Sequence, residues 1–309
     1  MLRFILKRIL MLIPVLLGVS LIVFMLMQLA PGDPAQIILG PQASPEDIAN
    51  MREVMGLNRP LYIQFLSFLK GLLSLDFGVS LKDQQPVLNR LMAALPYTAQ
   101  LALAAIVVAL LIGIPVGIIA ATKQYSIFDR ISTVLALIGF STPNFWLSIM
   151  LILVFAVNLR WLPVSGAKNL SYLILPAIAL GTQSAAIITR MTRSSMLEVL
   201  SQDYISTAKA KGLPPRVIIL KHALKNALIP IITVAGLQMG LMLGGAILTE
   251  TVFAWPGIGR LMIDSIRAKD TPVVQGGVII TASLFVFVNL IVDILYAYVD
   301  PRVKEHYKK

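Results

Sequence analysis

The sequence predicts an all-α membrane protein with six transmembrane helices, because its composition is unusually apolar and its charged residues are confined between long apolar runs. Of 309 residues, 57% are hydrophobic and 13% are charged, whereas globular proteins average about 25% charged residues. A soluble fold this apolar would expose large hydrophobic patches. The composition therefore excludes a soluble enzyme and a disordered chain, and it makes lipid the expected solvent.

Six stretches without a charged residue are each long enough to cross a bilayer, which takes about 20 residues in a helix. They cover residues 9–32, 91–122, 131–159, 169–189, 226–249 and 271–292. All are rich in Leu, Ile, Val and Ala, and none alternates apolar and polar residues as a membrane β-strand does. The first stretch exceeds the about 7–15 residues that form the core of a secretion signal, so we expect a retained anchor.

The distribution of Lys and Arg predicts the orientation of these helices. With the N-terminus inside, the inner segments hold 16 of the 26 basic residues, and the longer outer segments hold ten. The inner segments are residues 1–8, 123–130, 190–225 and 293–309. We therefore expect a multi-pass protein of the bacterial inner membrane with both termini in the cytoplasm. The net charge of +11 then reflects this bias, and no nucleic-acid partner is needed to explain it.

Two long connections divide the chain into three parts. Residues 1–32 form the N-terminal tail and first helix, residues 33–90 an outer lobe, and residues 91–309 a five-helix core with the inner loop 190–225. The lobe contains two helix-like pieces, 45–55 and 61–73. Ser44 before Pro45 is a typical N-cap for the first piece.

Several kinds of chemistry are missing from the chain. The six stretches contain no Asp, Glu or His, which proton-coupled carriers use as intramembrane relays. The sequence has no cysteine, no G-x-x-x-x-G-K-[ST] phosphate loop, no H-E-x-x-H metal helix and no G-x-S-x-G elbow. We therefore expect a chain that is not an enzyme and that binds no cofactor or metal. A secondary carrier and an intramembrane enzyme both become poor alternatives.

Polar residues in the third stretch have two interpretations. Ser141, Thr142 and Asn144 surround Pro143, where hydroxyls of neighbouring residues can cap the backbone groups that a kink sets free. Alternatively, these three residues line a polar path through the membrane together with Gln238 of the fifth stretch.

Glycines recur every four residues in the fifth stretch. Gly236, Gly240 and Gly244 share one helix face, and Gly113 and Gly117 repeat the spacing in the second stretch. Glycine lets membrane helices approach closely. The face either packs within this chain or forms a seam with a partner subunit.

The inner loop contains the segment SQDYISTAKAKG, residues 201–212. It predicts a short helix with Asp203 as N-cap, with Lys209 and Lys211 at the end where the helix dipole favours cations, and with Gly212 as the terminating C′ glycine. Such a helix either rests on anionic lipid or offers a docking surface, in which case we expect Tyr204, Ile205 or Ala208 to become buried.

Many sequence blocks occur in an order that points to one family. They are LRFILKRIL, APGDPA, GLNRPLYIQF, DFGVSL, SIFDR, RMTRSSMLEVLSQDYISTAKAKG, KHALKNALIP, LTETVFAWPGIGR, PVVQGG and NLIVDILYAYVDPRV. With these blocks the chain resembles, almost from end to end, the membrane permease subunit of bacterial ABC importers for dipeptides, oligopeptides, glutathione and nickel.

In that family the inner loop carries the coupling motif E-A-A-x-x-x-G followed by I-x-L-P. Gly212 matches the glycine of the motif. Ser206, Thr207 and Ala208 stand where E-A-A is expected, so only the last alanine matches. The closing Leu-Ile-Pro ends at Pro230, later than the general spacing. These departures put any role of the missing glutamate in doubt.

The resemblance implies a type I ABC importer permease fold and a set of partners. A homologous second permease would complete a two-fold pseudo-symmetric pore, two cytoplasmic ATPase subunits would hold ATP and Mg, and an outer solute-binding protein would deliver substrate to the lobe 33–90 and the loop 250–270. The ATPase docking residues would be Asp203, Tyr204, Ile205, Ser206, Thr207, Ala208, Lys209, Lys211 and Gly212.

The substrate implied first is a dipeptide or oligopeptide, or glutathione, because uncharged helices suit a pore that need not chelate. Nickel or another small solute is the alternative, although neither His222 nor His306 lies in a membrane stretch. A stand-alone channel or carrier is a further alternative.

Overall fold

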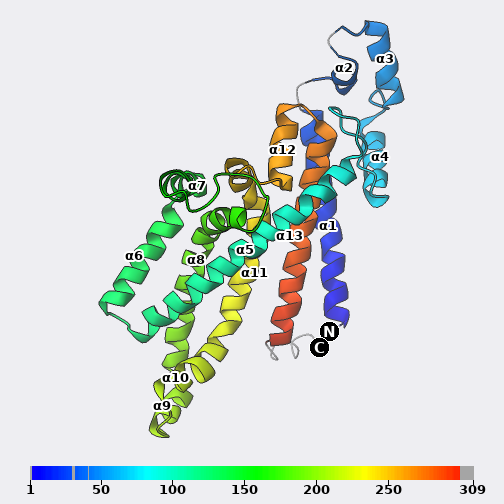
Figure 1. Cartoon of the computed structure of the whole chain (residues 1–309). Coiled ribbons are helices and arrows are strands. Elements are labelled where there is room, and N and C mark those ends of the chain that lie inside the picture. The colour runs from blue at the N-terminus through cyan, green and yellow to red at the C-terminus, as the bar shows by residue number, and fades with distance from the viewer. Residues whose placement is uncertain (1, 30–31, 41, 300–309) are drawn as a thin grey trace.

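The structure, a computed structural model, describes residues 2–29, 32–40 and 42–299. Its described part is a bundle of helices (Figure 1). Five helical segments are long and apolar enough to cross a membrane, as the sequence predicts. They lie in α1 (Leu2–Gln28), α5 (Val87–Thr122), α8 (Ser171–Leu200), α11 (Leu224–Val252) with the short helices before it, and α13 (Thr271–Val299).

The third predicted span, residues 131–159, is broken. Helix α6 (Ile127–Ser141) is followed by α7 (Asn144–Leu151) and a π-helical segment, η1 (Ile152–Asn158), and the two halves meet at an angle of 102°. Pro143 lacks an N–H group and pushes the residue before it into extended backbone, and Thr142 has φ −76° and ψ 123°. The prediction of one continuous helix over residues 131–159 is therefore wrong, whereas the kink that the sequence predicts at Pro143 is present.

Helix α8 is the centre of the bundle, with α5, α6, α7 and α11 packed against it. The closest approach is to α5. A Cβ added at Gly117 of α5 would lie 2.5 Å from Cβ of Thr192, and one at Gly113 would lie 2.7 Å from Cγ2 of Ile188. The Gly113–Gly117 pair thus allows the two backbones to pack within the chain.

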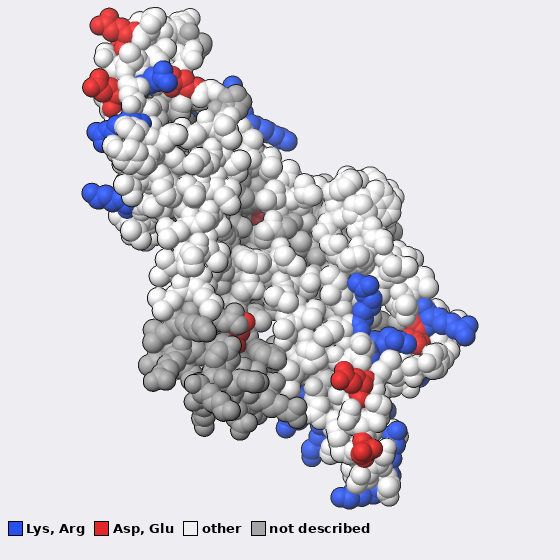
Figure 2. Space-filling view, turned by 180° about the vertical axis from the view of Figure 1, so that it is seen from behind, with Lys and Arg blue, Asp and Glu red and all other residues white. Residues whose placement is uncertain are grey.

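Short helices lie at both ends of the bundle, which are named the outer and the inner end after the orientation that the sequence predicts (Figure 1). At the outer end are α2 (Pro34–Leu39), α3 (Pro45–Val54), α4 (Leu61–Leu73) and α12 (Ile258–Arg267); at the opposite end are α9 (Asp203–Ala210) and α10 (Pro215–Val217). Both predicted lobe helices are present, and Ser44 caps α3 by accepting a hydrogen bond from the Asp47 backbone N–H at 3.1 Å. Seen from behind, charged side chains gather toward the two ends and leave a belt nearly free of charge (Figure 2).

Candidate functional site

The predicted short helix of the inner loop is α9, and its start differs from the expectation. Gln202 is the N-cap residue, with φ −77° and ψ 148°, and its side chain makes no capping hydrogen bond. Asp203 is the first residue of the helix. Its assignment as N-cap is therefore wrong; because residue 202 takes the extended conformation, the carboxylate falls in the first helical turn, where the helix dipole favours a negative charge.

The end of α9 follows the prediction. Gly212 has a φ of +74°. Its N–H donates to the Lys209 carbonyl at 2.9 Å, and the N–H of Leu213 donates to the Ala208 carbonyl at 3.3 Å. These two bonds satisfy carbonyls that the helix end would leave without partners. No atom lies within 4 Å of a Cβ added at Gly212, so the need for glycine is conformational and not steric.

The apolar side of α9 faces its own chain. Ile205 is fully buried and Ala208 is 7% exposed, in a core they share with Met196 of α8 and two residues of the π-helical segment η2 (Ile218–Ala223). This corrects the expectation that Ile205 or Ala208 fills a partner's groove. The residues of α9 and its C-terminal turn that a partner can reach are Asp203, Tyr204, Ser206, Thr207, Lys209, Ala210, Lys211 and Gly212.

Tyr204 connects α9 to a membrane helix. Its ring is 42% exposed, and its hydroxyl oxygen accepts a hydrogen bond from Nδ2 of Asn226 at 2.8 Å. Asn226 lies in the first turn of α11. Helix α9 is therefore connected to α11 through this bond, and to α8 and η2 through the buried Ile205 and Ala208.

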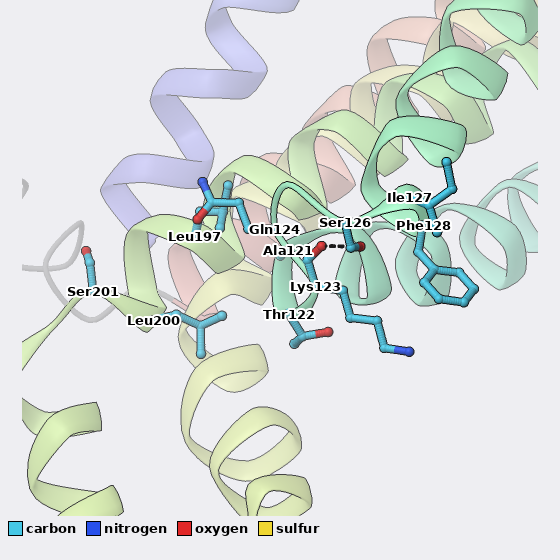
Figure 3. A pocket seen from close by; sticks show the side chains of 10 residues that line it. All are labelled: Ala121, Thr122, Lys123, Gln124, Ser126, Ile127, Phe128, Leu197, Leu200 and Ser201. Carbon is cyan, nitrogen blue, oxygen red and sulfur yellow. Dashed lines mark hydrogen bonds between the residues drawn. The ribbon is translucent and has the colours of Figure 1, made fainter.

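A second inner-face feature lies beside the end of α8. The turn between α5 and α6 and the last turn of α8 enclose an open hollow of about 680 Å³, lined by Lys123, Ser126, Leu197 and Leu200 among others (Figure 3). Two hydrogen bonds join Asp129 of α6 to Arg193 of α8, at 2.6 and 2.8 Å. The α5–α6 turn is thus fixed to the helix that leads into α9.

The polar residues at the α6–α7 break support the kink interpretation. The hydroxyl of Thr142 donates to the Ile138 carbonyl at 2.7 Å, and Nε2 of Gln183 donates to the Phe140 carbonyl at 3.4 Å. Nδ2 of Asn144 lies 3.5 Å from Oε1 of Gln183. The side chain of Ser141 is exposed. The Ile138 carbonyl also accepts from the Thr142 backbone N–H at 2.9 Å, so the carbonyl at the break that a side chain of α8 satisfies is that of Phe140.

The same residues extend toward α11. Ser184, next to Gln183 on α8, donates to Oε1 of Gln238 at 3.1 Å. Oδ1 of Asn144 is buried without a hydrogen-bond partner in the described structure. Gln183 and Ser184, which the sequence analysis passed over, thus lie between the two groups of candidate path residues. The sequence feature that could have identified this pair is the occurrence of two adjacent polar residues inside an apolar stretch.

The glycine face of α11 is divided. A Cβ at Gly236 would collide with Val292 of α13, and one at Gly240 would lie 3.2 Å from Cε2 of Phe285, also on α13. A Cβ at Gly244 would meet nothing within 4 Å. Gly236 and Gly240 therefore pack within the chain, whereas Gly244 faces away from it.

Two buried carboxylates at the outer end were not singled out from the sequence. Glu250 and Asp270 both have 0% exposure. Glu250 accepts hydrogen bonds from the Thr98 hydroxyl at 2.7 Å and from the Arg260 backbone N–H at 3.0 Å. Each carboxylate joins the loop 250–270 to residues at or before the outer end of α5.

Asp270 lies at the start of α13. It accepts from the Ser80 hydroxyl at 2.5 Å, from the Leu81 backbone N–H at 3.0 Å and from Nη1 of Arg90 at 3.3 Å. Ser80 also contacts Asp83. A hydrogen bond with the Ser80 side chain lowers the pKa of Asp83, and the positive charge of Arg90 lowers it too.

Comparisons with known proteins agree with this architecture. The model of the family "binding-protein-dependent transport system inner membrane component" matches residues 113–305, and the model of the N-terminal part of such membrane components matches residues 1–102. Together the two matches cover most of the chain. The chain belongs to the family of binding-protein-dependent transport system inner membrane components, and it is a multi-pass inner-membrane protein.

Curated relatives cover nearly the whole chain. The dipeptide transport system permease protein DppB of Alkalihalophilus pseudofirmus is 47% identical over 98% of this chain and 100% of its own length. DppB of Escherichia coli is 43% identical over 98% and 99%. The glutathione transport system permease protein GsiC of Salmonella choleraesuis is 43% identical over the same shares.

Solved structures show the same fold at low identity. One structure of the MetNI methionine ABC transporter in inward facing conformations is similar over 68% of this chain and 96% of its own chain, with a TM-score of 0.60 and 20% identity. An amino acid ABC transporter reaches a TM-score of 0.51 at 14% identity, over 69% and 94%. The core therefore has the type I ABC importer permease fold, and the chain acts as the permease of an ATP-driven importer.

Proposed function

We propose that this permease forms half of the translocation path for dipeptides, short oligopeptides or glutathione. The observation that carries the proposal is the 43–47% identity, over 98% of the chain, to permeases named for dipeptide and glutathione transport. These substrates share amide groups and a small size. The uncharged polar side chains of Ser141, Thr142, Asn144 and Gln238 suit amide groups, since amides and hydroxyls both donate and accept hydrogen bonds.

A homologous second permease, two cytoplasmic ATPase subunits and a solute-binding protein complete the proposed importer. ATP and Mg belong to the ATPase subunits, which dock on the exposed side of α9. Two features support this docking site: α9 ends in basic residues, and it is joined to α8 and α11 by buried contacts and the Tyr204–Asn226 bond. Closure of the ATPases would then move α11, which carries Gln238, and α8, whose Gln183 and Ser184 contact the path residues.

The proposed orientation places both termini and α9 in the cytoplasm, and α2, α3 and α12 outside. The excess of basic residues in the inner segments supports it. The outer lobe and the loop 250–270 then meet the binding protein. Reporter fusions test the orientation: a fusion at Gln84 should report the outside, and fusions at Gln202 and Lys308 the inside. An outside signal at Gln202 would overturn it.

Uptake measurements test the substrate. Cells that express the importer with this chain should accumulate a labelled dipeptide, and cells that lack only this chain should not. Unlabelled peptides and glutathione should compete, whereas nickel should not. Nickel accumulation that depends on this chain, with unchanged peptide uptake, would contradict the proposal. The purified chain alone should bind no ATP.

A further inference from the structure

Helix α4 is apolar on the side that faces away from the protein. Tyr62, Leu66 and Leu73 are 67%, 61% and 89% exposed, and at about 100° per residue they fall within about 40° of one another on the helix surface. Neither α3 nor α4 has a buried residue, but the sequence of α3, PEDIANMREV, is rich in charged residues, whereas that of α4, LYIQFLSFLKGLL, is mostly apolar. The two helices of the lobe therefore present different surfaces to their surroundings.

Contacts with α1 fix the level of α4 relative to the membrane. Nε2 of Gln28, at the outer end of the apolar span Leu10–Gln28, donates to Oε1 of Gln64 at 3.1 Å. The ring of Phe24 lies 5.4 Å from that of Phe65 and 6.0 Å from that of Phe68. As α4 proceeds from residue 64 to residue 68, it therefore moves inward along α1.

Phe24 lies four residues inward of Gln28 along α1, and Leu73 lies five residues beyond Phe68, which is beside Phe24. At about 1.5 Å per residue, these two separations together place the end of α4 roughly 10–15 Å inward of the level of Gln28. That is about half of the hydrocarbon core, which is about 30 Å thick. With 13 residues, α4 is too short to cross the membrane.

A hollow shared with α13 gives a similar level. Ser67 and Gly71 of α4 and Asp76 after it line this hollow of about 240 Å³ together with Pro272, Gln275 and Gly276 in the first turns of α13. Helix α13 is one of the spanning helices. The second half of α4 thus lies beside the outer turns of two separate membrane spans.

We infer that α4 lies in the outer leaflet of the bilayer, with its face of Tyr62, Leu66 and Leu73 against phospholipid acyl chains. Helix α1 also exposes apolar side chains, since Leu21 and Met25 of α1 and Leu29 directly after it are 42%, 48% and 80% exposed. Lys70, also exposed on α4, can extend its amine toward the headgroups. The outer lobe is then held to the membrane by α4 as well as by α1, so that α2 and α3 stand above an anchored base.

The absence of cysteine from the chain allows a direct test. Leu66→Cys, Leu73→Cys and, as a control on α3, Asn50→Cys each carry a single spin label in the assembled importer, in phosphatidylcholine bilayers. Power saturation then compares collisions with oxygen, which enters the acyl region, and with a water-soluble nickel chelate. Peptide uptake by each labelled variant verifies that the complex is intact.

The ratio of oxygen to nickel accessibility should be several-fold higher at positions 66 and 73 than at position 50, and higher at 73 than at 66. Equal nickel accessibility at 73 and 50 would place α4 in water and overturn the inference. Exclusion of both reagents at 66 and 73 would also overturn it, because a partner protein would then cover the face.

Discussion

The carboxylate of Asp129 and the guanidinium of Arg193 form a two-bonded ion pair between α6 and α8, at 2.6 and 2.8 Å. Asp129 is 4% exposed and also accepts from the Tyr125 backbone N–H at 3.0 Å. Bidentate pairs of this kind are stronger than neutral hydrogen bonds and fix the orientation of both groups. The pair therefore holds the start of the broken span against the central helix.

Removal of either partner should destabilise the chain. We expect Asp129→Asn or Arg193→Gln to lower the free energy of unfolding by about 1–3 kcal/mol, because a mostly buried charge loses its partner. Thermal unfolding of the purified permease measures this. Arg190→Gln is the control, since the guanidinium of Arg190 lies over the ring of Phe140, at 4.9 Å from its centroid. Equal melting temperatures for Arg193→Gln and Arg190→Gln would contradict the structural role of the pair.

Tyr204→Phe should reduce the efficiency of coupling more than it reduces stability. It removes only the hydroxyl that binds Asn226, and a hydrogen bond of this kind contributes about 0.5–1.5 kcal/mol. We expect less peptide uptake per ATP hydrolysed by the assembled importer. Tyr125→Phe, at a side chain that is 77% exposed, should change nothing. Because Tyr204 and Asn226 act through one bond, the double variant with Asn226→Ala should be no worse than the single ones; additive losses would argue against the connection.

Gly212 tests whether the left-handed turn after α9 is required. Gly212→Val should cost about 1–2 kcal/mol or more, because a branched side chain is unfavourable at a φ of +74°. Gly212→Asn should be much milder, since asparagine adopts this conformation more readily and no atom within 4 Å opposes a Cβ. Uptake and substrate-stimulated ATP hydrolysis at matched protein abundance measure the difference. Equal activity of the two variants would show that the turn does not constrain α9.

The helix boundaries and turns that depend on local sequence could be predicted. The limits of α4, the Ser44 cap, the C′ role of Gly212 and the break at Pro143 follow from spacing, polarity and backbone preferences of a few neighbouring residues. The 102° angle of that break could not be predicted, because it depends on how α7 packs against α8 and α11. The inward direction of Ile205 and Ala208 was missed for the same reason: α9 has apolar residues that suit either a partner or its own chain.

The buried carboxylates were missed because their chemistry depends on tertiary contacts. In the sequence Glu250 follows directly after an apolar stretch and looks like the first residue of an outer loop. Its partner Thr98 is 152 positions away. The glycine face of α11 shows the same limit. Gly236 and Gly244 each lie four residues from Gly240, but of these two only Gly236 faces α13.

The division of the glycine face can be measured. Gly236→Ala should destabilise the permease by about 1–3 kcal/mol, because its methyl group would overlap Val292 and force α11 and α13 apart. Gly244→Ala should be neutral or slightly stabilising in the purified chain, as alanine favours a helix over glycine. The melting temperatures of both variants, measured by thermal unfolding, test this difference in stability. Similar melting temperatures would mean that α13 moves aside without cost.

Glu250 should be essential for the structure of the outer loop that follows α11. Its two oxygens accept from the Thr98 hydroxyl and the Arg260 backbone N–H, and Thr98 in turn accepts from the Ile258 backbone N–H at 2.9 Å. Gly257 lies directly against the carboxylate, without space for a side chain. The acceptor geometry of Glu250 and the absence of a Cβ at residue 257 therefore depend on one another.

Glu250→Gln replaces one acceptor oxygen with a donating NH2 group, which must then face one of the two donors. Glu250→Ala leaves both donors unsatisfied and also creates a cavity. We expect losses of about 1–3 kcal/mol for the first variant and more for the second, together with faster protease cleavage in the loop 250–270. Asp264→Ala is the control, because Asp264 is exposed and its ion pair with Arg260 lies at the surface at 3.7 Å, where such pairs contribute about 0–1 kcal/mol. If Glu250→Ala melts and is cleaved like Asp264→Ala, the buried carboxylate does not hold the loop against α5.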